Sequence, residues 1–333
     1  MDTRYHRIVI AALLAVTSIL SWGASAQACD FEAVMTDDCS TGTGFTKGNS
    51  DTSTDFGVIT SKYNWTRFSA FRDVEQIVLK SCVFAQPVSL NSHTKRRGSK
   101  SLDLSSQQLV KLTKSVRKYI SVWEKAELSV NGRTIKSGVR FDFGPIDTPF
   151  LCEYHSDTHV RLAFNDINVN AAALGTKGLR SDRPLWNGGI SVTIATKKVL
   201  FGRSILKPSG VVHEFGHVLG FDHEMAHKGW VPCAEALNVE RWVRGDRISY
   251  GSGLSTNENV TIAERRFKQY KTQIKGVKFP RPFDAQSVMG YAIKSAYFDS
   301  ASNLPAGGCG MTGSRTHLSN VDKEVLLLFY GTN

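Results

Sequence analysis

The stretch V-V-H-E-F-G-H-V-L-G-F-D-H-E, residues 211–224, determines how the whole chain is interpreted. His213 and His217 are four residues apart. On a helix with 3.6 residues per turn, both imidazoles therefore project from one face. Gly220 is well placed to end this helix, because glycine accepts the left-handed conformation that reverses the chain. The reversal brings His223 back toward the first two histidines.

Three histidines at this spacing predict a zinc site. Three imidazoles on one ion leave a fourth position for water, which distinguishes a catalytic zinc site from a closed structural one. We therefore predict that Zn²⁺ is held by His213, His217 and His223. Glu214 follows the first ligand, where its carboxylate can reach metal-bound water and act as general base without ligating. H-E-x-x-H alone occurs in unrelated helices, but H-E-x-x-H-x-x-G-x-x-H fixes five positions and is far more specific.

The long motif resembles that of the metzincin zinc metallopeptidases, and Glu224 directly after it resembles the astacin branch. A second segment, Ser287-Val288-Met289-Gly290-Tyr291, is similar to the metzincin Met-turn. The resemblance implies that Met289 forms a hydrophobic floor beneath the zinc. It also implies that Tyr291 lies near the metal, as an extra ligand or as a phenol that donates to the reaction intermediate. Gly290 departs from this pattern, because His is commonest there.

The resemblance extends from Val74 to the C-terminus and implies a fold. That fold is α+β (mixed α/β), a metzincin-like zincin domain with a twisted, mostly parallel sheet and an antiparallel edge strand. Two long helices and an irregular C-terminal subdomain complete it. Substrate would lie antiparallel to the edge strand, and the counterpart of that strand is the segment Ala171, Ala172, Ala173, Leu174, Gly175. An inner strand, Ile190–Ile194, follows it.

Local patterns over the same region independently predict a mixture of strands and helices. Ser105 and Gln108 form a capping box at the start of one helix. Its apolar stripe is Leu109, Leu112, Val116, Ile120 and Trp123. Asn131-Gly132 is a hairpin turn signal. A last helix is expected over Leu318–Leu328, capped by Ser319 or Asn320.

The first 26 residues have the composition of a secretory signal peptide. Two arginines precede the apolar run Ile8–Leu20, and Ala24-Ser25-Ala26 fits a cleavage site. We expect cleavage after Ala26 and a secreted or extracytoplasmic mature protein. Cleavage two residues later would leave Cys29 first, which keeps a lipoprotein as an alternative.

Residues 27–73 are rich in Ser, Thr, Gly and Asp and lack periodicity, so we predict an N-terminal arm or pro-segment. The zinc metallopeptidase catalytic domain is expected over residues 74–333. Two alternatives stay open for the arm. Residues up to about Arg72 are removed or displaced on activation, or Cys29 and Cys39 staple the arm permanently to the domain.

All six cysteines lie beyond the signal peptide, and an even number in an exported chain favours disulfides. Six cysteines allow fifteen pairings, among which the sequence does not choose. Trp230 and Cys233 are expected in a loop insertion near the cleft, and His227 is interpreted as a surface or cleft residue.

The formal net charge is +11, and it falls to +10 without residues 1–26, which carry two arginines and one aspartate. Such a balance favours acidic surfaces or substrates, but no nucleic-acid motif accompanies it. No stretch beyond the signal peptide approaches the ~20 apolar residues of a transmembrane helix. We expect a monomer that acts on a polypeptide substrate, with no nucleic-acid partner and no membrane span.

Together these features predict a secreted zinc-dependent endopeptidase that hydrolyses peptide bonds through a metal-activated water. Two alternatives remain. A catalytically silent metzincin-like binding protein would not need Glu214. A zinc hydrolase of a non-peptide bond is compatible with the same motif.

Overall fold

The computed structural model describes most of the chain after residue 74. The described residues are 65, 75–90, 100–155, 157–167, 170–175, 189–199, 203–248, 254–268, 283–299, 308–311, 313 and 315–332. The predicted signal peptide lies outside them. So does the predicted N-terminal arm, apart from Trp65.

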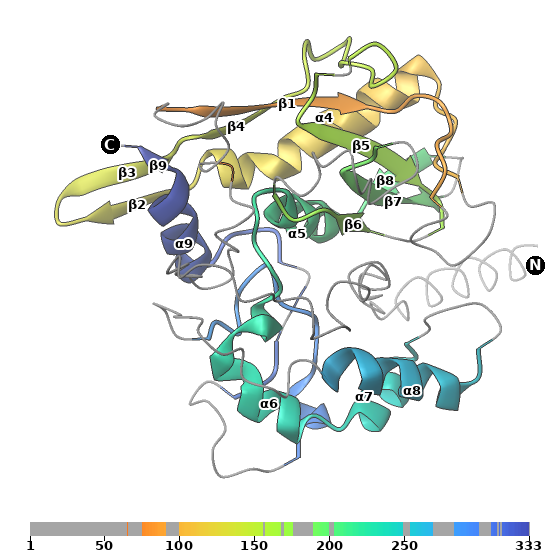
Figure 1. Cartoon of the computed structure of the whole chain (residues 1–333), viewed down its shortest axis with the longest axis vertical. Helices are drawn as coiled ribbons and strands as arrows, with labels where there is room; N and C mark the ends of the chain where they lie inside the picture. Colours follow the sequence, from red (N-terminus) through yellow and green to blue (C-terminus); the bar gives the residue numbers. More distant parts are fainter. Residues whose placement is uncertain are drawn as a thin grey trace, which may run out of the picture.

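A six-stranded sheet occupies the upper half of the molecule (Figure 1). Its strands are β1 (Ile77–Val83), β4 (Val139–Asp142), β5 (Val160–Asn165), β6 (Ala171–Ala172), β7 (Val192–Val199) and β8 (Arg203–Leu206). Along the order β4-β1-β5-β7-β6 the first four strands are parallel, and β6 is antiparallel to β7. β8 also pairs antiparallel with β7. This topology confirms the predicted class, a mostly parallel mixed sheet with an antiparallel edge strand.

Two helices pack against the sheet and against each other, α4 (Ser106–Glu124) and α5 (Pro208–Val218). The predicted capping box at Ser105 and Gln108 begins α4, and the whole predicted apolar stripe is buried. Helix α5 begins with Pro208 in its first turn, where proline is tolerated because that N–H has no intrahelical partner. The indole Nε1 of Trp123 donates to the carbonyl of Val212 at 3.0 Å, which ties α4 directly to α5.

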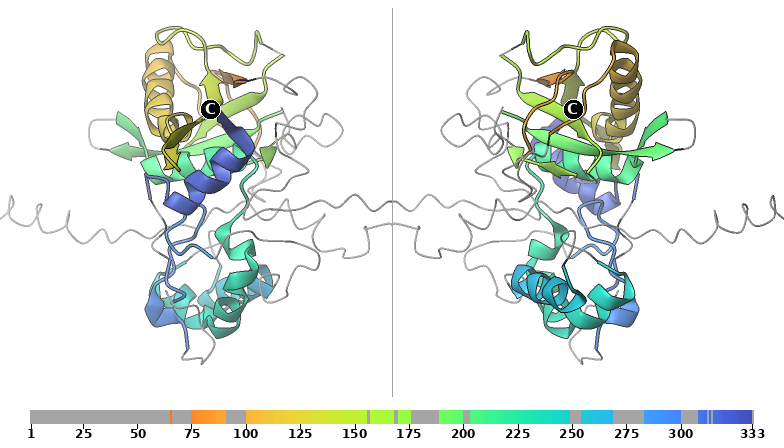
Figure 2. Two further views of the ribbon diagram at one scale, coloured as in Figure 1. Left: turned by 90° about the vertical axis from the view of Figure 1, so that its left-hand side faces the viewer. Right: turned by 90° about the vertical axis from the view of Figure 1, so that its right-hand side faces the viewer.

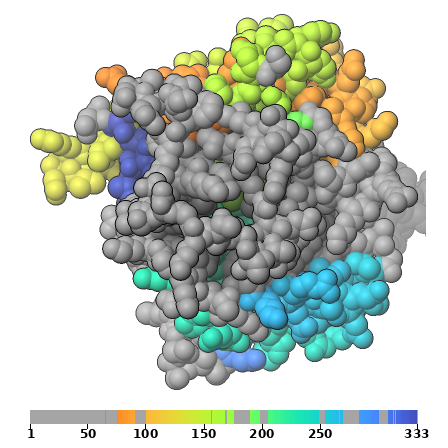
Figure 3. All heavy atoms as spheres, in the orientation of Figure 1, coloured from red at the N-terminus to blue at the C-terminus, as the bar shows by residue number. Residues whose placement is uncertain are grey.

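A small three-stranded sheet and the last helix form the left side of Figure 1. They are β2 (Glu127–Val130), β3 (Arg133–Ser137), β9 (Gly331–Thr332) and α9 (Asn320–Tyr330). The hairpin β2–β3 turns at Asn131 and Gly132, both with positive φ, as the sequence predicted. It projects from the body of the molecule in the space-filling view (Figure 3). Ser319 caps α9, also as predicted.

The lower half contains α6 (Val231–Ala236), α7 (Val239–Gly245) and α8 (Thr256–Phe267), which lie apart from the sheet in all views (Figures 1 and 2). The predicted loop around Trp230 and Cys233 is therefore helical instead. Trp230 ends a 3₁₀ turn, Lys228–Trp230, and Cys233 lies in α6. These helices contribute to a second apolar cluster, in which the rings of Trp230 and Trp242 both contact that of Phe267. This cluster explains why they fold here, since each helix is too short to be stable alone.

Two disulfides join segments that are distant in the sequence. Cys82 pairs with Cys152 at the sheet, and Cys233 pairs with Cys309 in the lower half. The other two cysteines, Cys29 and Cys39, lie outside the described residues. Among the helices of the described part of the chain, none is long and apolar enough to cross a membrane.

Candidate metal centre

Helix α5 carries two of the three predicted ligands on one buried face. His213 and His217 are both buried, and their rings lie edge to face at a centroid distance of 4.8 Å. The helix ends in the predicted reversal at Gly220, whose φ is +93°. After the turn the chain brings His223 back, with its ring 4.6 Å from that of His217. The spacing argument therefore placed all three side chains correctly.

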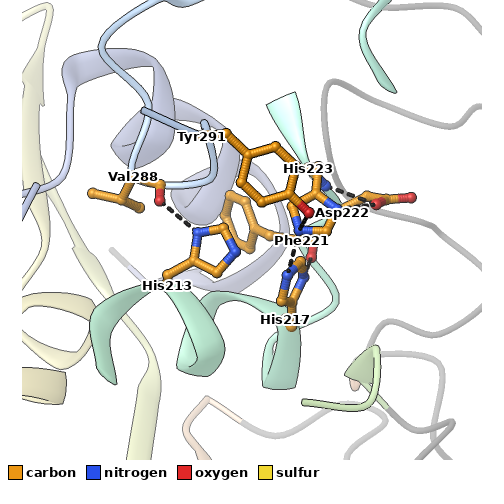
Figure 4. Close-up of polar contacts among 7 residues, drawn as sticks. All are labelled: His213, His217, Phe221, Asp222, His223, Val288 and Tyr291. Atoms are coloured by element: carbon orange, nitrogen blue, oxygen red, sulfur yellow. Dashed lines mark hydrogen bonds and ion pairs between the residues drawn. The ribbon is translucent and has the colours of Figure 1, made fainter. Parts of the chain in front are cut away.

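Hydrogen bonds orient two of these rings (Figure 4). The Nδ1 of His213 lies 2.8 Å from the carbonyl oxygen of Val288, and the Nδ1 of His217 lies 2.6 Å from that of Phe221. Because a carbonyl oxygen can only accept, Nδ1 carries the proton in both neutral rings. Each Nε2 is then unprotonated and presents a lone pair, which is the form that a metal ion requires.

The Nε2 atoms have the arrangement of a metal site. One ligand atom from each of the three histidines lies within 4.8 Å of the other two. Nε2 of His217 lies 3.2 Å from Nε2 of His223, close to the ~3.3 Å edge of a tetrahedron with zinc–nitrogen bonds of ~2.0–2.1 Å. The buried Nε2 of His213 has no hydrogen-bond partner among the described residues. A cation at the centre would satisfy these lone pairs, so the three residues fit a metal ion.

Burial keeps the three imidazoles neutral. Desolvation lowers the pKa of His213 to about 4. Desolvation, followed by repulsion from His213, lowers the pKa of His217 to about 3. The pKa of His223 is also lowered well below its ordinary value, first by burial and then by the two neighbouring rings. Near neutral pH the site therefore needs no deprotonation before it binds a metal.

Glu214 is completely buried in α5, directly after the first histidine. Its position on the helix follows the sequence motif, and its role as general base stays a prediction. Tyr291 comes from a different part of the chain, yet its hydroxyl lies 3.1 Å from Nε2 of His223. That distance matches the separation of two ligands on one ion, so the phenol reaches the position that the resemblance implied (Figure 4).

The segment Ser287–Tyr291 passes close beneath α5. A Cβ on Gly216 would clash with the sulfur of Met289 and would lie 2.9 Å from the indole of Trp123. Only a glycine at position 216 therefore allows this contact. Met289 itself is fully buried and lies against α5, while its role as a floor beneath a metal ion stays a prediction.

Asp322, in the first turn of α9, holds this segment in place. Its two carboxylate oxygens accept from the hydroxyl of Ser287 at 2.7 Å, the backbone N–H of Val288 at 3.1 Å and that of Ser319 at 2.9 Å. Since the carbonyl of Val288 orients His213, Asp322 contributes indirectly to the ring's position. Only the S-x-x-D spacing of the helix cap signals this residue in the sequence.

Glu224 fastens the other side of the segment. Its backbone N–H donates to the carbonyl of Met289 at 3.1 Å, and its Oε1 accepts from the N–H of Asp284 at 2.8 Å. Burial raises the pKa of this carboxyl well above its ordinary value, while the hydrogen bond from Asp284 acts in the opposite direction. Glu224 thus joins the loop that carries His223 to the segment that carries Met289.

The remaining sequence predictions have mixed outcomes. Of the predicted edge segment Ala171–Gly175, only Ala171 and Ala172 form an antiparallel strand beside β7, and the N–H of Ala173 extends it by donating to the carbonyl of Ser191 at 2.8 Å. Their contact with substrate stays a prediction. His227, which was interpreted as a surface or cleft residue, is buried. Its Nδ1 accepts from the N–H of Gly229 and caps a 3₁₀ turn.

Similar solved structures include two of myroilysin and one fish enzyme. The first, "Structure of myroilysin", is 17% identical over 83% of this chain and 98% of its own, with a TM-score of 0.44. The second myroilysin structure is 18% identical over 78% and 87%, with a TM-score of 0.38. High choriolytic enzyme 1, a hatching enzyme zinc-protease from Oryzias latipes (medaka fish), is 12% identical over 81% and 96%, with a TM-score of 0.37.

No protein-family model matches the sequence, and no curated protein matches it. At these identities and scores, the assignment of a function rests on the residues of the site itself.

Proposed function

We propose that this protein is a secreted zinc-dependent endopeptidase of the metzincin type, nearest to the astacin-like branch. The observation that carries the proposal is the convergence of three buried, neutral imidazoles from H-E-x-x-H-x-x-G-x-x-H, with the hydroxyl of Tyr291 3.1 Å from the third. A closed structural site would have four protein ligands, whereas three histidines leave a position for water and substrate.

His213, His217 and His223 would hold the zinc. When bound, zinc polarises the scissile carbonyl and lowers the pKa of its water toward ~7. Glu214 takes the proton from the attacking water and passes it to the leaving amine as the peptide bond breaks. The phenol of Tyr291 donates to the negative charge that develops on the substrate's carbonyl oxygen. Met289 beneath α5 and the hydrogen bonds to the carbonyls of Val288 and Phe221 fix the site's geometry.

A polypeptide substrate would bind as an added strand along Ala171, Ala172, Ala173, Leu174 and Gly175. Main-chain hydrogen bonds give such binding its affinity, and the edge position of β6 supports it. Secretion is supported by the composition of residues 1–26 and by two disulfides, which persist in oxidising compartments. We also propose a monomer without a nucleic-acid partner.

Two features of the chain argue against the alternative functions. A silent binding protein has no use for a carboxylate beside the first ligand, so the presence of Glu214 favours an enzyme. A hydrolase of a non-peptide bond is disfavoured by the antiparallel edge strand β6, which contacts α5 and suits an extended polypeptide.

The test is hydrolysis of a proteome-derived peptide library by the purified exported protein, with products identified by mass spectrometry. Glu214→Gln should abolish cleavage while zinc content and fold are retained, because the amide keeps the shape but cannot accept the proton. Tyr291→Phe should be milder, a loss of about 10²-fold.

Elemental analysis provides the metal control. The wild type should carry one zinc, and His213→Ala, His217→Ala and His223→Ala should each lose it. Full zinc in all three variants would refute the site, and unchanged turnover by Glu214→Gln would place the base elsewhere.

A further inference from the structure

Trp65 lies in the compositionally simple N-terminal region, yet it is one of the most deeply buried residues of the domain, with 1% of its surface exposed. It belongs to the main apolar cluster, which also contains the sheet, α4 and α5. Its ring packs edge to face on His159, just before β5, with centroids 5.8 Å apart. The side chain therefore lies in the core formed by the sheet, α4 and α5.

The indole Nε1 of Trp65 donates to the carbonyl oxygen of Val218 at 2.6 Å, and both groups are buried. Val218 is the last residue of α5 and directly follows the ligand His217. The last four carbonyls of a helix have no intrahelical partner. A buried carbonyl there needs a donor from elsewhere, and Trp65 supplies it from 153 positions away in the sequence.

The other backbone carbonyls at this helix end also accept hydrogen bonds. Those of Gly216 and His217 accept from the N–H groups of Phe221 and Gly220, which belong to the turn itself. The carbonyl of Leu219 accepts from the hydroxyl of Tyr330 at 2.7 Å. That hydroxyl also accepts from the backbone N–H of Trp65 at 3.4 Å. Trp65 and Tyr330 thus fix the two residues that separate His217 from the turn at Gly220.

We propose that Trp65 is a permanent part of the catalytic domain and a positioning residue for the zinc site, so that any maturation cleavage falls on its N-terminal side. The part of this proposal that concerns the zinc site rests on the proposed function. It narrows the removable part of the predicted pro-segment, which had been expected to reach about Arg72.

The first experiment needs no peptidase activity. The wild-type protein is purified from the medium, and its folded, zinc-bound form is analysed by intact mass and N-terminal sequencing. We expect the N-terminus at or before residue 65. A zinc-bound, folded protein that begins after residue 65 would overturn the proposal, whatever its activity.

The second experiment separates positioning from simple core packing. Trp65→Phe keeps an aromatic ring in the core but removes the N–H donor to Val218. Trp242→Phe is the matched control, because Trp242 is equally buried and its Nε1 has no hydrogen-bond partner among the described residues. Both substitutions should lower the melting temperature, by about 5–10 °C.

Only Trp65→Phe should weaken zinc affinity, by about 3- to 10-fold in competition with a chelator, since it frees the helix end that carries His217. Equal zinc affinities for Trp65→Phe, Trp242→Phe and the wild type would refute the positioning role. If Trp65→Phe is not exported, the N-terminal analysis of the wild type still decides the boundary. A protein that retains Trp65 and binds zinc but cleaves no peptide would refute only the proposed function.

Discussion

The metal-free protein should lose stability sharply between pH 7 and pH 5. In the folded state burial holds the pKa of His213 at about 4 and that of His217 at about 3, whereas in the unfolded chain each titrates near its ordinary value of 6.5. As the pH falls below 6.5 the unfolded state therefore binds protons that the folded state does not. The stability contributed by neutral burial is complete above pH 6.5 and is lost progressively as the pH falls toward the folded pKa values.

The size of the effect follows from these values. For His213, the change from pH 7 to pH 5 lowers the free energy of unfolding by about 2 kcal/mol, and His217 gives a similar term. His223 acts in the same direction. Two such terms, about 4 kcal/mol, are a large part of a typical total stability of about 5–15 kcal/mol. The carboxyls of Glu224 and Asp322 act in the opposite direction. Burial raises their pKa, so their protonation at lower pH stabilises the folded protein.

The assay is urea denaturation of chelator-treated protein at both pH values, compared with the variant His213→Gln/His217→Gln. The variant lacks the two histidine terms but keeps the buried carboxyls, so the difference between the proteins isolates the histidines. We expect the wild type to lose about 4 kcal/mol more than the variant on acidification. Parallel pH dependences in the two proteins would refute the reasoning. Zinc-loaded wild type should resist the same change, since binding stabilises the neutral ligands.

Three further substitutions test the packing around the site. Gly216→Ala should lower stability by about 1–3 kcal/mol in thermal unfolding, because its methyl group clashes with the sulfur of Met289; an unchanged melting temperature would contradict this close contact. Phe267→Leu removes a ring 6.3 Å from that of Tyr291 and should lower kcat about 2- to 13-fold. The same change in a Tyr291→Phe background should have no further effect, and an equal loss there would mean that Phe267 does not act through the phenol. Cys233→Ser removes the disulfide to Cys309, which spans 76 positions, and should lower the free energy of unfolding in urea by about 2–5 kcal/mol under oxidising conditions. Equal stability of the variant and the wild type would show that this segment is held without the disulfide.

The parts of this site that sequence predicts are those encoded by local spacing. His213, His217, Gly220 and His223 lie within one helix and the turn that follows it, so local geometry alone brings the three histidines together. The helix caps at Ser105 and Ser319, the hairpin at Asn131-Gly132 and the buried stripe of α4 are local in the same sense. Each was predictable because the signal and the structure span the same few residues.

The parts that sequence does not predict are long-range contacts. Trp65 is a single aromatic residue in a region without periodicity, and nothing near it in the sequence indicates that it packs on a helix end 153 residues later. Helices α6, α7 and α8 form because their apolar residues meet in one cluster, and short segments of this kind read as a loop when taken one at a time. His227 caps a 3₁₀ turn next to this cluster, and its ring lies 6.5 Å from that of Phe283, which packs against the cluster.

The two apolar clusters meet at the candidate metal centre, and this arrangement explains why distant residues matter there. His213 and His217 are fixed to the main cluster through α5, whereas Tyr291 belongs to the second cluster together with Met225, two residues after His223. A metal ion bound to all three histidines would therefore link the upper and lower halves at their junction. The free energy of metal binding would therefore stabilise the arrangement of the two halves as well as the positions of the three histidines. Glu224, directly after His223, reinforces the same junction through its hydrogen bonds to Met289 and Asp284, so the loop that carries the third histidine is fastened without the ion as well.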